Sequence, residues 1–133
     1  MFKNAKIGKI SRYGDSGPGP KGSVLTVSFE LEGLEFTALN CGPQYKFTQA
    51  ISLQVDCKSQ EEVDYYWDKL SEGGEIIQCG WLKDKFGLSW QIVPTALIEK
   101  LNDSDPAKAS RVMQAMMQMK KLYIAELQKA YSG

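Results

Sequence analysis

The stretch from Gln78 to Pro94, QCGWLKDKFGLSWQIVP, constrains the fold of this chain more than any other part of its sequence. Two apolar runs that carry aromatic residues flank the polar tetrad Asp84-Lys85-Phe86-Gly87, and the tetrad ends in a residue that tolerates a positive φ. This arrangement predicts a tight connection between two strands. Alternation along the second strand gives one face for a core and one wetter face, made respectively of Leu88, Trp90, Ile92 and of Ser89, Gln91, Val93.

Upstream of this stretch, extended runs alternate with loops. Residues 24–31 alternate cleanly between apolar and polar side chains, and Glu32-Gly33 turns the chain into residues 34–40, which predicts an antiparallel hairpin. Further strands are expected at residues 6–13 and 51–56. Loops are expected at residues 14–22, where GDSGPGPKG holds four glycines and two prolines, and at residues 41–49, which carry Gly42-Pro43.

A helix is expected to begin after Ser59. Glu62 stands three residues beyond this serine, as in a capping box. An apolar stripe at helical spacing follows and indicates a helix with one buried face; its members are Val63, Tyr66, Trp67 and Leu70. The pair Gly73-Gly74 is expected to end the helix.

Downstream of Pro94, the pattern indicates a helical tail. Residues 95–101 predict one helix, and residues 124–130 predict another. Between them, Asp105 is expected to cap a helix that has Pro106 at its first position and runs to about Lys120. This middle helix carries a methionine run, which we expect to form a subunit interface rather than to pack only against the sheet: Met113, Met116, Met117 and Met119.

These segments together resemble the PhnB-like family, which is also labelled 3-demethylubiquinone-9 3-methyltransferase. The resemblance rests on the closing hairpin, on VDCKSQEEVDYYWDKLSEGGE before it and on VMQAMMQMKKLYIAEL after it, and so covers nearly the whole chain. The family belongs to the vicinal-oxygen-chelate superfamily, which includes glyoxalases, extradiol dioxygenases and bleomycin-resistance proteins.

The resemblance implies an α+β fold of paired βαβββ modules whose sheets curl around a shared cavity. Residues 1–133 are then expected to form a single glyoxalase-like domain, with an incomplete first module at 1–49, a second module at 50–94 and a helical tail at 95–133. The family's first strand and first helix have no counterpart here. Either the start lies at an internal methionine, or the form is naturally shortened. A homodimer is expected, because an exposed sheet edge recruits another chain.

The resemblance also implies where a metal site would lie, and the residues there do not suit one. Metal-dependent relatives place four ligands, commonly His and Glu, on four strands. The first ligand would fall in the missing strand, the second within residues 37–40, the third near Ala50 and the fourth at Gln91. None of these positions here offers an imidazole or a carboxylate, and an amide oxygen is a weak ligand for a transition metal. We therefore expect no metal and no cofactor.

A set of small polar side chains is expected to share the cavity side of the strands. Hydroxyls and amides of this kind can orient a neutral or zwitterionic ligand by hydrogen bonds. The alternative is a solvated sheet face, because any half-exposed antiparallel strand alternates in this way. The resemblance favours the cavity reading, with Thr26, Ser28, Ser52, Gln54, Ser89 and Gln91 as candidate ligand-binding residues.

Composition excludes several function classes. Sixteen basic and sixteen acidic side chains cancel, which disfavours nucleic acid as a partner. No apolar run approaches the ~20 residues that a membrane span needs. With no histidine, Ser–His–Asp and Cys–His catalysis are impossible. The three cysteines lack CxxC spacing and are expected to be reduced thiols of a cytoplasmic protein. Cys41 and Cys79 each adjoin a glycine, but without a nearby base they are expected to be fillers.

Three functional hypotheses follow. The first is a metal-free small-molecule-binding protein of the PhnB-like group. The second is an enzyme of the vicinal-oxygen-chelate type with an atypical site. The methyltransferase label of the family is discounted, because no Gly-rich loop leading from a strand into a helix supports an adenosylmethionine site. The third is a non-catalytic assembly or interaction subunit. The residues favour binding over catalysis and do not identify a ligand.

Overall fold

Two β-sheets and four helices make up this mixed α+β chain, and the computed structural model describes all of residues 1–133. The chain divides into two compact units, Met1–Lys46 and Phe47–Gly133, which we call unit 1 and unit 2. The division falls within the predicted loop at residues 41–49, close to the boundary expected between the two modules. The α+β class predicted from the sequence is confirmed.

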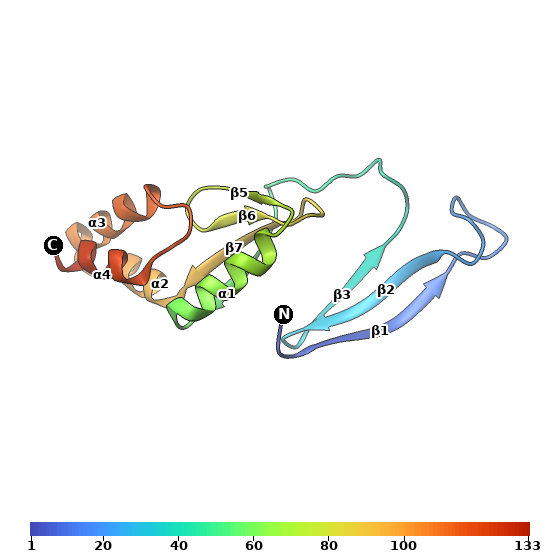
Figure 1. The fold of residues 1–133 in the computed structure, drawn as a ribbon, viewed down its shortest axis with the longest axis horizontal. Helices are drawn as coiled ribbons and strands as arrows, with labels where there is room; N and C mark the ends of the chain where they lie inside the picture. Colours follow the sequence, from blue (N-terminus) through green and yellow to red (C-terminus); the bar gives the residue numbers. More distant parts are fainter. The chain divides into compact units, whose positions relative to one another are not determined.

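Unit 1 contains an antiparallel sheet of three strands in the order β1-β2-β3. The strands are β1 (Ala5–Arg12), β2 (Val24–Leu31) and β3 (Leu34–Leu39) (Figure 1). The turn between β2 and β3 has positive φ at both central residues, 48° at Glu32 and 84° at Gly33. This is the backbone form that matches the twist of a two-residue hairpin, so the predicted hairpin is confirmed.

The loop at residues 14–22 is ordered by one aromatic ring. Tyr13 is the only buried hydrophobic side chain of unit 1. Its hydroxyl donates a hydrogen bond to the carbonyl of Asn40. A Cβ atom at Gly19 would lie 2.3 Å from the Tyr13 ring, so only glycine allows the loop to approach so closely.

Unit 2 contains a four-stranded sheet in the order β4-β7-β6-β5. The strands are β4 (Ser52–Cys57), β5 (Glu75–Ile76), β6 (Trp81–Lys83) and β7 (Ser89–Pro94). β4 runs parallel to β7, and the other two pairings are antiparallel. Helix α1 (Gln60–Ser71) connects β4 to β5. Unit 2 therefore contains the complete βαβββ module that the resemblance implied.

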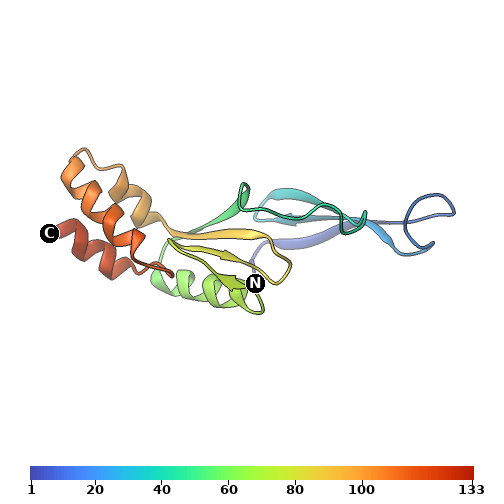
Figure 2. The same cartoon turned by 90° about the horizontal axis from the view of Figure 1, so that it is seen from above.

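Helix α1 begins as its sequence predicts. The Ser59 hydroxyl accepts a hydrogen bond from the Glu62 N–H at 3.2 Å. The Glu62 carboxylate accepts from the Lys58 N–H at 2.7 Å, one residue before the cap, so the reciprocal bond of the capping box is shifted by one position. Figure 2 shows α1 along one side of the unit 2 sheet. Its contact face consists of three buried residues, Val63, Trp67 and Leu70.

A single carboxylate holds the connection between β6 and β7. Asp84 Oδ1 accepts hydrogen bonds from the N–H groups of Phe86 at 2.8 Å and Leu88 at 3.1 Å. Asp84 Oδ2 accepts from the indole N–H of Trp90 at 3.0 Å. Gly87 has a φ of 86°, as the tetrad predicted. The turn and the following strand are thus joined through one side chain.

We predict that Asp84→Ala lowers the free energy of unfolding by about 2–3 kcal/mol, because three hydrogen bonds to a charged acceptor are lost together. Urea unfolding followed by tryptophan fluorescence measures the change. The matched control is Lys85→Ala in the same turn, whose side chain is exposed and which should change the stability little. Equal effects of the two substitutions would contradict the role given to Asp84.

The helical tail consists of α2 (Thr95–Leu101), α3 (Pro106–Met117) and α4 (Ile124–Ser132). These helices pack around a core of Val93, Leu97, Val112, Leu122 and Leu127. No helix of the chain combines the length and the apolar character needed to cross a membrane.

The middle helix ends at Met117, earlier than the expected end near Lys120. The reason is a backbone pairing outside the helix. The carbonyl of Met119 accepts a hydrogen bond from the Cys79 N–H, and that of Lys120 accepts from the Gly80 N–H, both at 2.8 Å. Residues beyond the helix therefore bond to the segment that leads into β6.

The methionine run does not form one surface. Met116 and Met119 pack against the core of the helical tail. Met113 and Met117 are 41% and 56% exposed. The part of the run available to a second subunit is therefore smaller than its sequence suggested, and the homodimer stays a prediction.

Gln60 joins the start of α1 to the segment before α4. Its Nε2 donates to the Leu122 carbonyl at 3.1 Å and to Asp64 Oδ1 at 3.0 Å, and its Oε1 accepts from the Ile124 N–H at 2.8 Å. Lys121 forms an ion pair with Asp64 at 2.9 Å. The hydrogen bond from Gln60 and that from Lys121 lower the pKa of Asp64 below its ordinary value of 3.8.

This pKa shift predicts a pH dependence. A carboxyl whose pKa is depressed in the folded state stabilises the fold above its ordinary pKa, and the contribution is lost as the pH falls through the lower folded value. Asp64→Asn should therefore cost about 0.5 kcal/mol at neutral pH, where the ion pair is partly exposed, and nothing once the pH is well below 3.8. The free energy of unfolding, measured for both proteins at neutral pH and at a pH well below 3.8, checks this prediction. The exposed substitution Glu99→Gln is the control. A cost of Asp64→Asn that does not change with pH would contradict the prediction.

Candidate functional site

Four of the six candidate residues form a compact group on one face of the unit 2 sheet. Ser52 lies opposite Ser89, and Gln54 lies opposite Gln91, across the parallel pair of β4 and β7. Opposed residues of neighbouring strands present their side chains on the same face. Gln91 Nε2 donates a hydrogen bond to Ser52 Oγ at 2.9 Å. The structure thus brings Ser52, Ser89 and Gln91 together around one interaction.

Ser89 is the unusual member of this group. Its side chain is fully buried, and its Oγ atom has no hydrogen-bond partner. Buried polar atoms in native structures are nearly always paired, because an unpaired one costs about 1–3 kcal/mol. A new hydrogen-bond partner for Ser89 Oγ would therefore remove this cost.

Strand β6 adds two side chains to this face that the alternation of the other strands did not predict. Trp81 lies opposite Gln91, and Lys83 lies opposite Ser89. Trp81 is half-buried and lies on the polar face. Lys83 forms an ion pair with Glu75 at 3.3 Å. These neighbours follow from the register between strands, which the alternation within a single strand does not specify.

The polar face is bounded at one end by the helical tail. Gln54 is exposed and donates to Asp56 Oδ1 at 2.6 Å, and Asp56 continues the same alternation, so it could have been found from the sequence. Val93, on the same side of β7 as Gln91, is buried in the core of the tail. The prediction of a uniformly wetter face is therefore wrong for Ser89 and Val93, because both are buried.

Thr26 and Ser28 lie in unit 1, on the polar face of β2. The Thr26 hydroxyl is hydrogen-bonded to that of Ser11 on β1. Ser28 lies opposite Thr37 on β3. Ser11 and Thr37 were not among the candidates, and the cross-strand register again identifies them. Thr26 and Ser28 therefore each have a hydroxyl-bearing neighbour within unit 1.

The residues present do not suit a metal ion. No group of three or more cysteine, aspartate and glutamate side chains lies close enough together to hold one. At the expected fourth ligand position, the amide of Gln91 is hydrogen-bonded to Ser52.

The three cysteines differ in their surroundings. Cys57 is fully buried, and burial, with smaller contributions from Glu62 and Asp56, raises the pKa of its thiol to about 12. Cys41 and Cys79 are partly exposed. Because the thiolate is the nucleophile, Cys57 is unsuited to nucleophilic chemistry.

We predict that iodoacetamide at neutral pH modifies Cys41 and Cys79 in the native protein and spares Cys57, since its thiol is buried and protonated. Mass spectrometry of the labelled protein shows which thiols react, and denatured protein, in which all three should react, is the control. Rapid native labelling of Cys57 would contradict its assignment as a buried thiol.

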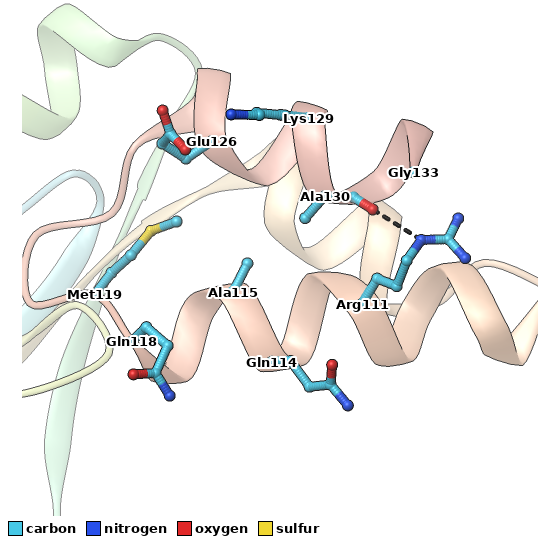
Figure 3. Close-up of a pocket in the computed structure, with 9 residues that line it drawn as sticks. All are labelled: Arg111, Gln114, Ala115, Gln118, Met119, Glu126, Lys129, Ala130 and Gly133. Atoms are coloured by element: carbon cyan, nitrogen blue, oxygen red, sulfur yellow. Dashed lines mark hydrogen bonds between the residues drawn. The ribbon is translucent and has the colours of Figure 1, made fainter.

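A further groove, of about 680 Å³, lies between α3 and α4 (Figure 3). Arg111 spans it: its Nε donates to the Ala130 carbonyl and its Nη2 to the Tyr131 carbonyl, both at 3.0 Å. The guanidinium therefore satisfies carbonyls at the end of α4, where a cation also suits the helix dipole. None of the six candidate residues lines this groove.

Comparison with known proteins gives one family. The family model described as 3-demethylubiquinone-9 3-methyltransferase matches residues 1–93. The chain is 37% identical to a PhnB protein from Bacillus cereus, with a TM-score of 0.62 over 70% of this chain and 81% of that one. A Pseudomonas aeruginosa protein, 20% identical with a TM-score of 0.54 over 67% of this chain and 77% of that one, is similar in fold. No curated protein matches the chain.

Proposed function

Because this chain belongs to the PhnB-like family, also described as 3-demethylubiquinone-9 3-methyltransferase, we propose that it binds a small polar molecule without using a metal ion. The proposed site is the polar face of unit 2, centred on Ser52, Ser89 and Gln91. Hydroxyl and amide groups offer both donors and acceptors, so they can orient a ligand that carries no net charge.

The unpaired hydroxyl of Ser89 is the observation that carries this proposal. A hydroxyl confined beside Gln91 and Lys83 destabilises the protein unless something accepts or donates a hydrogen bond there. A ligand that hydrogen-bonds to this hydroxyl would recover the cost.

The neighbours of Ser89 and Gln91 indicate the class of ligand. Trp81, opposite Gln91, offers a flat apolar surface, and Lys83 is already paired with Glu75. A neutral or zwitterionic molecule with one flat or apolar portion fits these groups best. An anion would have to compete with Glu75 for Lys83.

The methyl transfer named in the family description finds no support in the residues of this chain. One common form of site for a nucleotide-type cofactor such as adenosylmethionine uses a Gly-rich loop that leads from a strand into a helix. The glycine-rich loop here, residues 14–22, joins β1 to β2, and its Gly19 is packed on Tyr13. We therefore propose binding rather than catalysis.

A thermal-shift screen of neutral and zwitterionic small molecules tests the proposal, because a ligand of the native state raises the melting temperature. For a ligand found in this way, Gln91→Leu should weaken binding by about 1–3 kcal/mol, since a polar group of the ligand loses its partner. Titration calorimetry measures the affinity. A chelator should leave it unchanged.

Ser89→Ala separates function from stability. Without ligand, this variant should be more stable than the wild type by about 1 kcal/mol, because a buried unpaired hydroxyl is removed. It should also bind the ligand more weakly. The matched control for the amide substitution is Gln114→Leu, an exposed position on α3. Unchanged affinity in both Ser89→Ala and Gln91→Leu would place the ligand elsewhere.

A further inference from the structure

One row of the unit 2 sheet carries four polar side chains on four neighbouring strands. From β4 to β5, the strand register places them in the order Ser52, Ser89, Lys83 and Glu75. Residues opposed in this way present their side chains on one face of the sheet, with Cβ atoms about 5 Å apart. Two hydroxyls are therefore followed by one cation and one anion along a single line across the sheet.

The charged end of this row is a single, solvent-accessible ion pair. Lys83 Nζ lies 3.3 Å from Glu75 Oε2, and the two side chains are 34% and 65% exposed. Neither side chain forms a second ion pair within the chain. Because an exposed ion pair is held weakly, the charged groups of a ligand can replace its contacts at little cost.

The two opposite charges restrict the kind of ligand that can enter the pair. An anion bound to Lys83 would leave the Glu75 carboxylate without its partner, and a cation bound to Glu75 would leave the Lys83 ammonium without one. A ligand that leaves a charge unpaired is disfavoured relative to one that pairs it. A zwitterion supplies a partner for each of the two charges, so one ion pair is exchanged for two.

Trp81 is placed to contact an apolar part of the same ligand. It lies two residues from Lys83 along β6, so its side chain is on the same face, at a distance of about 7 Å along the strand. The indole is half-buried and lies opposite Gln91. Aromatic rings gain an additional attraction when they stack on one another, so an aromatic group suits this position better than an aliphatic one.

We infer that the polar face of unit 2 binds a zwitterion that carries its ammonium and carboxylate close together beside an aromatic ring, as an aromatic α-amino acid does. The carboxylate binds Lys83, the ammonium binds Glu75 and the ring lies against Trp81. At Lys83 the carboxylate is next to Ser89 in the row, and it can accept a hydrogen bond from the unpaired hydroxyl of that serine. This assignment of a ligand class rests on the proposed function, because it uses the same face as the binding site.

Three forms of one compound test the two charges separately. L-phenylalanine is a zwitterion, N-acetyl-L-phenylalanine keeps only the carboxylate, and L-phenylalanine methyl ester keeps only the ammonium. In an NMR titration of the full chain, we expect L-phenylalanine to shift the indole N–H signal of Trp81. Each derivative should bind about tenfold more weakly, because one charge of the protein loses its partner. L-alanine, which lacks the ring, should bind about fivefold more weakly than L-phenylalanine.

Matched variants assign each charge of the ligand to its partner. In Lys83→Gln, the methyl ester should bind as tightly as L-phenylalanine, and in Glu75→Gln the N-acetyl derivative should do so. Lys85→Gln changes an exposed lysine of the neighbouring turn and should leave both differences in affinity as they are in the wild type. Equal binding of the three compounds to the wild type overturns the assignment, and so do differences that persist in both Lys83→Gln and Glu75→Gln.

Failure of this assignment can be told apart from failure of the proposed function. If L-phenylalanine does not bind, but the thermal-shift screen yields a neutral ligand whose affinity falls in Gln91→Leu, the polar face is the binding site and its ligand is not a zwitterion. If no ligand of any class depends on Ser89 or Gln91, the binding site itself is wrong, and the assignment of its ligand fails with it.

Discussion

The fold of unit 2 depends on covering the apolar side of its sheet. Leu82 and Ile92 lose all exposure because α1 packs over them, and α1 reaches that position because β4 pairs in parallel with β7. A parallel pairing requires a crossover long enough to hold a helix. The same element, α1, therefore both connects the strands and covers the apolar side of the sheet. The burial of this layer stabilises the module by about 25 cal/mol per Å² of apolar surface removed from water.

The polar face is a consequence of that packing. Once Trp90 and Ile92 are directed to α1, alternation directs Ser89 and Gln91 to the other side, where no helix of the βαβββ module covers them. Asp84 reinforces this orientation, because its bond to the Trp90 indole fixes the side chain that precedes Gln91. The candidate site therefore requires no special backbone geometry. It follows from strand β7, because the apolar side of this strand already packs against α1.

Patterns among residues close in sequence predicted much of this structure. Features that depend on contacts between distant segments were not predicted. Alternation predicted the residues 24–31 strand, and Ser59, Asp105 and the tetrad at residues 84–87 predicted caps and a turn, because each depends on neighbours in sequence. The position of Trp81 beside Gln91 depends on register between strands, which no single segment specifies. The burial of Val93 and the early end of α3 depend on contacts with segments distant in sequence, and no local pattern predicted either of them. Whether the six candidates act as one site stays a prediction.

The methionines of the helical tail differ in exposure, so their oxidation should have different structural consequences. Met113 and Met117 are exposed, and their conversion to sulfoxides would place a polar group where water already lies. Met116 and Met119 pack against Leu122 and its neighbours, where a sulfoxide would have to be buried or would force the helices apart. The two surface thioethers can thus consume peroxide at little structural cost, next to two whose oxidation would loosen the tail.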